Sequence, residues 1–270
     1  MINSVSLLIR IVCKFSTVYF QIFSLLLFTS TIIHIESKII NLKSISSAFK
    51  SSNLKQQRVL LISLGGFRHD YITSYDMTNF NNFIQDGVRA SYLDPQFTTQ
   101  SFPNSWSMVT GAYVETHGII GNKFYDPYLD EYFHQNKHDI KWWNETEPIW
   151  YTAALQGVKT GVYHWPGSEA TFHNTSLYKR MHYNENTPFH VKANVTMHWL
   201  LNDNFKFVCM YHNQPDLIAH KYGINSPEFN VTLAQLDELF GSLINQLKEN
   251  GLYYANDFNM VVVSDHGKFC

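Results

Sequence analysis

Two carboxylate–imidazole couples and one serine stand out, because such residues can bind a metal ion or attack a substrate. Asp216 and His220 are four residues apart, so in a helix they share one face and can bind one metal ion. Asp265 and His266 follow an apolar run and offer a second couple with mixed nitrogen and oxygen donors. Taken singly, each couple is equally typical of a helix cap beside an ordinary histidine. Together with Ser101 they favour a two-metal hydrolase.

Ser101 begins a segment that predicts a short helix. Pro103 suits the first helical turn, Trp106 supplies a residue to bury, and Gly111 ends the helix. A serine at the positive end of a helix lies beside free N–H groups that can hold an anion. Its hydroxyl could attack phosphorus if a metal lowered its pKa. The alternative is that Ser101 is only an N-cap residue.

The elements that must position these residues alternate between apolar strands and helices. Strands are predicted at 59–64, 158–165, 205–211 and 260–263, and helices at 78–85, 147–155, 189–201 and from Ser226 to Gly251. This alternation predicts an α/β fold with a mostly parallel central sheet and helices on both faces. Ligands bind outside the carboxyl ends of such strands, where the candidate residues fall.

The N-terminal part predicts membrane targeting. Arg10 and Lys14 precede an apolar run to Ile35, so residues 1–37 are interpreted as a signal peptide or an uncleaved signal anchor. Residues 38–57 are interpreted as a linker, and residues 58–270 as the catalytic domain. The chain also carries four glycosylation sequons, which favour an extracellular or luminal location; they begin at Asn144, Asn174, Asn194 and Asn230.

Composition narrows the classes of function. The 270 residues carry a formal net charge of −2, which predicts no nucleic-acid-binding surface. Three cysteines are too few and too scattered for a disulfide scaffold or a cysteine zinc site. The hydrophobic content of 45% is enough for a substantial core.

From about Arg58 onward the chain resembles the ectonucleotide pyrophosphatase/phosphodiesterase family, within the alkaline-phosphatase-like superfamily. The resemblance rests on an ordered series of motifs: 63–68, 102–104, 109–111, 117–120, 122–127, 148–150, 165–169, Pro215-Asp216, His220 and 264–267. The chain is most similar to the members with a single catalytic domain.

The resemblance implies a two-zinc site and a nucleotide or other phosphodiester substrate. Ser101 would be the nucleophile, where the family usually has threonine, and would form a phosphoryl-enzyme ester. Asp216 and His220 would bind one zinc ion, and Asp265 and His266 would bind the other together with Ser101. The resemblance further assigns substrate contacts to three residues: Asn104 for the phosphoryl oxygen, and Trp165 and Tyr183 for the leaving portion.

The chain departs from the family pattern at two places. Gly65 stands where the family has an aspartate that binds the same zinc as the nucleophile, so this second zinc site is weakened. The chain also ends before a further zinc-binding histidine of the family, which predicts an incomplete domain with an exposed sheet edge.

These departures leave two functions open. One is an extracellular zinc-dependent phosphodiesterase or nucleotide pyrophosphatase. The other is a catalytically impaired relative that serves as a binding protein at the cell surface. A phosphomonoesterase or sulfatase of the same superfamily is disfavoured by the blocks Phe102-Pro-Asn104 and Trp165-Pro-Gly167.

Overall fold

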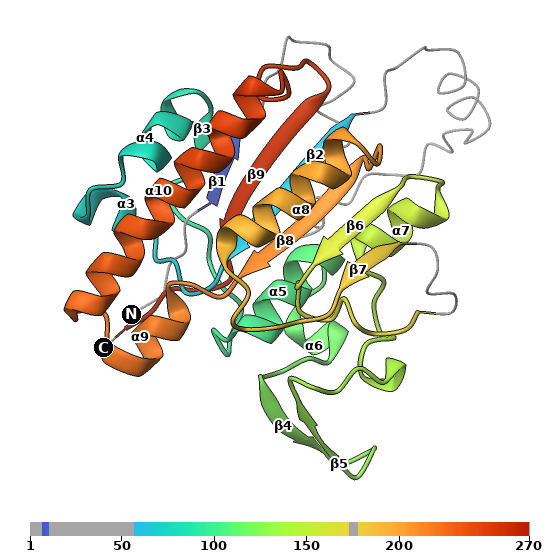
Figure 1. Cartoon of the computed structure of the whole chain (residues 1–270). Coiled ribbons are helices and arrows are strands. Elements are labelled where there is room, and N and C mark those ends of the chain that lie inside the picture. Colours follow the sequence, from blue (N-terminus) through green and yellow to red (C-terminus); the bar gives the residue numbers. More distant parts are fainter. Residues whose placement is uncertain (1–6, 11–56, 173–177, 270) are drawn as a thin grey trace, which may run out of the picture.

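A seven-stranded sheet forms the centre of the computed structural model, which describes residues 7–10, 57–172 and 178–269 (Figure 1). The strand order is β3-β1-β9-β2-β8-β6-β7. The bounds are β1 Leu7–Arg10, β2 Arg58–Leu64, β3 Val88–Arg89, β6 Thr160–Tyr163, β7 Lys179–Met181, β8 Phe207–His212 and β9 Phe258–Ser264. The strands from β9 to β7 are parallel, and β1 pairs antiparallel with β9 and β3.

Helices cover both faces of this sheet. In Figure 1, α4, α8 and α10 lie on the near side, and α5, α6 and α7 lie behind it. The bounds are α3 Tyr71–Ser74, α4 Thr78–Gln85, α5 Ser101–Thr110, α6 Val114–His117, the 3-10 helix Ile140–Trp142, α7 Ile149–Leu155, α8 Phe189–Leu201, α9 Asp216–Tyr222 and α10 Pro227–Glu249. The predicted α/β fold with a mostly parallel sheet is confirmed.

The central strands β2, β8 and β9 are mostly apolar because their side chains contribute to two cores, one on each face of the sheet. In β8, Val208 and Met210 belong to the core under α8 and α10, whereas Cys209 and Tyr211 belong to the core on the α5 and α7 side. Successive side chains of a strand point to opposite faces, so a strand covered on both sides must be hydrophobic at every position. This packing on both faces fixes the positions of the strand ends, and the candidate site lies at those ends.

Several element boundaries differ from those predicted. Strand β6 ends at Tyr163 and not at residue 165, because His164 has a φ of 62° and turns the chain out of the sheet. The segment before Lys141, for which no strand is predicted from the sequence, contains a hairpin formed by β4 Lys123–Asp126 and β5 Glu131–His134. Strand β9 lies inside the sheet, between β1 and β2.

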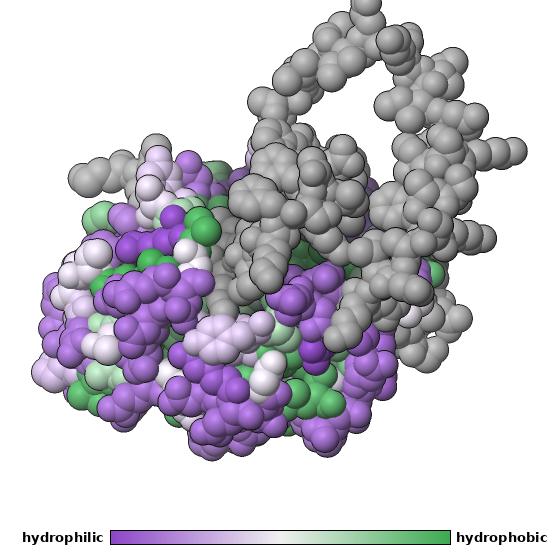
Figure 2. Space-filling model, turned by 90° about the horizontal axis from the view of Figure 1, so that it is seen from above, coloured by the Kyte–Doolittle hydropathy of each residue, from purple (hydrophilic) through white to green (hydrophobic). Residues whose placement is uncertain are grey.

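Most of the predicted leader and linker, together with Asn174, lies outside the described residues. Residues 7–10, within the predicted leader, form β1. Across the described part of the chain, no helix has the length and apolar character that membrane crossing requires. The face of the molecule seen in Figure 2 carries predominantly hydrophilic residues between smaller hydrophobic areas.

Candidate active site

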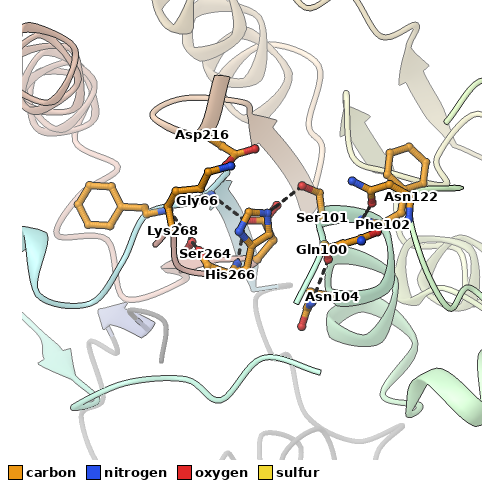
Figure 3. Close-up of polar contacts among 12 residues, drawn as sticks. Gly66, Gln100, Ser101, Phe102, Asn104, Asn122, Asp216, Ser264, His266 and Lys268 are labelled. Carbon is orange, nitrogen blue, oxygen red and sulfur yellow. Dashed lines mark hydrogen bonds and ion pairs between the residues drawn. The ribbon is translucent and has the colours of Figure 1, made fainter. Parts of the chain in front are cut away.

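The candidate residues converge where β2, β8 and β9 end, as the parallel sheet requires. Strand β2 leads into Gly65-Gly66, β8 leads into α9, and β9 leads into Asp265 and His266. Helix α5 brings Ser101 to the same place from the other side (Figure 3). The Gly66 N–H donates to Asp265 Oδ1 at 2.9 Å, and the Asp216 N–H donates to the carbonyl of Gly65 at 3.0 Å. The Gly65-Gly66 turn therefore joins the Asp265 carboxylate to the backbone at the start of α9.

Ser101 is the first helical residue of α5 and is only 8% exposed. The N-cap is Gln100, whose extended backbone begins the helix and whose side chain makes no cap hydrogen bond. The Ser101 hydroxyl lies 3.0 Å from Nε2 of His266. The alternative of a plain N-cap serine is therefore wrong, because this hydroxyl faces the second carboxylate–imidazole couple.

His266 is held in position by its neighbours. Its Nδ1 lies 3.0 Å from the carbonyl of Gly267, which can only accept, so Nδ1 carries the proton in the neutral ring and the Nε2 lone pair faces Ser101. Burial lowers the pKa of His266, but the charges of Asp265 and Asp216 outweigh this effect, and the pKa is raised overall.

Asp265 is fully buried between several donors. Its Oδ1 accepts from the His266 N–H at 2.9 Å as well as from Gly66. Its Oδ2 lies 3.6 Å from His266 Nε2 and accepts from the Tyr211 hydroxyl at 3.4 Å. The carboxylate is thus fixed by backbone groups on one oxygen and presents the other toward the imidazole.

Asp216 and His220 form the other couple, on helix α9. The predicted helical spacing is confirmed, with Asp216 Oδ2 3.2 Å from His220 Nε2. Lys268 reaches both residues: its Nζ is 3.3 Å from Asp216 Oδ1 and 2.6 Å from His220 Nε2. A lysine in this position has no counterpart among the residues singled out from the sequence.

A cavity of about 350 Å³ opens beside these groups. Ser101, Asp216 and His220 line one part of it, and Trp165 and Tyr183 line another. Tyr183 is 47% exposed, whereas Trp165 is buried and donates its indole N–H to the carbonyl of Ser105 at 2.9 Å. Both aromatic residues predicted for substrate contact are therefore at the cavity, with Tyr183 the more accessible.

Asn104 does not line the cavity, which corrects its assignment to the phosphoryl oxygen. Both ends of its amide are bound to the preceding loop: Oδ1 accepts from the Gln96 N–H at 2.6 Å, and Nδ2 donates to the Gln100 carbonyl at 2.9 Å. These bonds turn the Asn104 amide toward the loop and away from the cavity. Asn104 therefore braces the loop that leads into the helix.

Asn122, and not Asn104, lies at the cavity where an amide could contact a phosphoryl oxygen. It lines the cavity, and its Oδ1 accepts from the Phe102 N–H at 2.9 Å. Its amide nitrogen is left pointing toward Ser101 in Figure 3. The signal was present in the block Asn122–Pro127, but only the fold shows that this loop returns to the start of α5.

The donor sets of the two couples differ in how well they suit zinc. Within the described ranges, no group of three or more His, Cys, Asp or Glu side chains is placed to hold a metal. Ser101 supplies a third donor beside Asp265 and His266, at donor separations of 3.0 and 3.6 Å that suit ligands about 2 Å from one ion. Asp216 and His220 are also suitably spaced, but Lys268 contacts both. The donors Ser101, Asp265 and His266 therefore have the spacing that a zinc ion requires, whereas the Asp216–His220 couple is already in contact with Lys268.

The α/β sheet with a serine and two carboxylate–imidazole couples at one edge has the alkaline-phosphatase-like fold of its structural neighbours. A murine ectonucleotide pyrophosphatase/phosphodiesterase 5, an inactive variant in complex with AMP, superposes with a TM-score of 0.72 and 32% identity, over 78% of this chain and 57% of that one. The human protein of the same name gives a TM-score of 0.73.

Sequence comparison reaches the same family. The profile described as type I phosphodiesterase / nucleotide pyrophosphatase matches residues 59–268, and the chain belongs to this family. It is 36% identical to a bis(5'-adenosyl)-triphosphatase from Xenopus laevis, over 80% of this chain and 48% of the relative. It is also 36% identical to a venom phosphodiesterase from Naja atra, over 78% of this chain and 26% of the relative. The chain spans about half the length of the first of these relatives.

Proposed function

We propose that this site hydrolyses phosphodiester or pyrophosphate bonds of nucleotides, with Ser101 as the nucleophile. The observation that carries this proposal is the 3.0 Å contact between the Ser101 hydroxyl and His266 Nε2 at the wall of the cavity. The names of similar proteins, which include a triphosphatase of adenosyl groups and a complex with AMP, support a nucleotide as substrate.

The chemistry follows from the placement of Ser101. Its Oγ loses its proton to solvent and forms a bond to phosphorus while the bond from phosphorus to the leaving oxygen breaks. Water then hydrolyses the ester and restores the Ser101 hydroxyl. Ser101, Asp265 and His266 would hold one zinc ion, which would lower the pKa of the hydroxyl and stabilise charge on the phosphoryl oxygens. Asn122 is placed to donate its amide N–H to one of those oxygens, and Tyr183 to stack against the base.

The test is turnover by the full-length protein on a nitrophenyl ester of a nucleoside monophosphate, with zinc supplied. Ser101→Ala should reduce kcat on the order of a thousandfold or more, because the nucleophile is lost. Ser107→Ala is the matched control: it removes a serine hydroxyl from the same helix, bonded to His117 and not to His266. Equal turnover by the wild type and Ser101→Ala would remove Ser101 from the mechanism.

A catalytically impaired binding protein at the cell surface is a second candidate, favoured by Gly65. The position lacks the carboxylate that the family places there, and the Tyr211 hydroxyl lies 2.7 Å from where a Cβ would stand. If the wild type binds AMP but shows no turnover, while a variant with aspartate at residue 65 gains it, this candidate replaces the first.

We further propose that the protein enters the secretory pathway, with its N-terminal segment acting as a signal peptide or as a signal anchor. The sequon residues Asn144, Asn194 and Asn230 support this, because all three are exposed and open to glycosylation. Expression in a mammalian cell line should give a product whose mass falls on treatment with an N-glycosidase. A product of unmodified mass in the cytosolic fraction would contradict the proposal.

A further inference from the structure

The Asp216–His220 couple already has a cation, supplied by the chain itself. The Lys268 ammonium lies 2.6 Å from His220 Nε2 and 3.3 Å from Asp216 Oδ1. Figure 3 shows the Lys268 side chain extending toward the Asp216 carboxylate. Lys268 and Asp216 are largely shielded from water, with side-chain exposures of 18% and 14%. The ion pair is therefore not the loosely held kind found on a protein surface.

The segment that carries Lys268 is fixed in place. The Lys268 carbonyl accepts from Arg68 Nη1 at 3.0 Å. Arg68 in turn pairs with Asp70, with Nε 2.6 Å from Oδ1. The ammonium is thus directed to the couple by the backbone that follows His266, and its position does not depend on one flexible side chain alone.

Lysine and a metal ion compete for the same atoms. An ammonium group only donates, so its contact with His220 Nε2 uses the lone pair of that nitrogen. A divalent ion would need this lone pair and the Asp216 carboxylate. The two donor atoms, 3.2 Å apart, are spaced well enough for an ion, so donor spacing does not exclude a metal. Any ion bound there would lie against the positive charge of Lys268.

We propose that Lys268 replaces a metal ion at the Asp216–His220 couple, so that the site carries one divalent ion and one built-in ammonium. The inference deepens the proposed function and rests on it for its catalytic meaning, because it limits the metal to Ser101, Asp265 and His266. Its test counts bound metal and does not depend on turnover.

The experiment is a zinc titration of the metal-depleted full-length protein, with bound zinc counted by equilibrium dialysis. The wild type should bind one zinc ion in the active site, at Ser101, Asp265 and His266. Lys268→Met keeps the length of the side chain and removes the charge, so it should gain a second ion, or bind it about tenfold tighter or more. Lys268→Arg keeps the charge and should behave as the wild type.

Lys221→Met is the matched control, because Lys221 follows His220 directly but is exposed and faces the Tyr222 ring. It should leave the zinc count unchanged. Adding His220→Asn to Lys268→Met should remove the gained ion. Lys268→Gln, which keeps a hydrogen-bond donor, provides a second neutral variant if the methionine variant melts lower than the wild type without metal.

Two results would overturn the proposal. One is an identical zinc count and affinity in the wild type and both neutral variants. The other is a gained ion that persists after His220→Asn, since it would then be bound elsewhere. Failure of the proposed function has a different signature: the lysine variants would still differ in zinc binding, while none of the forms turned over a phosphodiester.

Discussion

Gly65 and Tyr211 together decide how many donors surround the ion proposed beside Ser101. A Cβ at Gly65 would lie 2.7 Å from the Tyr211 hydroxyl, closer than real side chains approach. That hydroxyl also donates to Asp265 Oδ2 at 3.4 Å. The phenol therefore fills the space of the absent carboxylate, and restoring an aspartate requires the hydroxyl to yield.

Gly65→Asp combined with Tyr211→Phe should bind zinc at Ser101, Asp265 and His266 about tenfold tighter or more than the wild type, because a fourth donor is added. Gly65→Asp alone should gain less and lose roughly 1–3 kcal/mol of stability, since the side chain is forced against the hydroxyl. Zinc titration and urea unfolding measure both effects.

Tyr211→Phe alone is the control, and should leave zinc affinity close to that of the wild type. If Gly65→Asp alone had the same stability and the same zinc affinity as the double variant, the Tyr211 hydroxyl would not be the obstruction.

Most residues of the site could be predicted because the apolar runs in the sequence show where the strands end. Ser101, Asp216 and His266 each follow or begin a recognisable element, and a parallel sheet brings such positions to one edge. Asn122 and Lys268 were missed because their roles depend on how a loop and a segment fold back, which no local spacing indicates. Asn104 was misplaced for the same reason.

At the scale of elements, α4 depends on α10 for its start. The N-cap of α4 is Met77, which offers no side-chain acceptor. Asp237 of α10 takes over this role, accepting from the N–H groups of Asn79 and Phe80 at 3.0 Å each. Unsatisfied N–H groups at a helix start normally need such partners. The two helices therefore form one unit on that face of the sheet.

Asp237→Ala should destabilise the protein by roughly 2–4 kcal/mol, because it removes the cap and leaves two N–H groups without a partner in a buried region. Urea unfolding monitored by far-UV circular dichroism measures the change. Glu238→Ala removes a carboxylate from the next, exposed position of the same helix and should change stability by about 0.5 kcal/mol or less. Equal losses for the two variants would show that the cap contributes nothing.

Local sequence patterns predicted the positions of these helices more accurately than those of the short strands. Helices α4 and α8 match their predicted bounds. The hairpin β4–β5 and the strand β7 were missed, since their half-exposed strands carry no continuous apolar run. Pairing with distant strands stabilises such segments, and that information is not local.

At the scale of the whole molecule, three histidines are buried by the fold and are neutral. Burial lowers the pKa of His117 and of His164 to about 4 each. It lowers the pKa of His212 to about 3, and the nearby Lys192 ammonium adds to the effect on both His164 and His212. Each histidine binds a proton in the unfolded chain near pH 6.5 but resists it in the fold.

The folded state should therefore lose stability as the pH falls from about 7 to about 5, with each histidine contributing at most about 1.4 kcal/mol per pH unit. The sign follows because the three buried histidines bind more protons in the unfolded chain than in the fold, and they outnumber His266, whose raised pKa acts in the opposite direction. Urea unfolding at several pH values measures the slope of stability against pH.

His117→Asn should be less stable at pH 7, because the contact of His117 Nε2 with Ser107 is lost. The slope of its stability against pH should nevertheless be smaller than that of the wild type by nearly one proton. His190→Asn, at an exposed position of α8, should keep the slope of the wild type. An unchanged slope in His117→Asn would mean that His117 already takes up its proton in the folded protein.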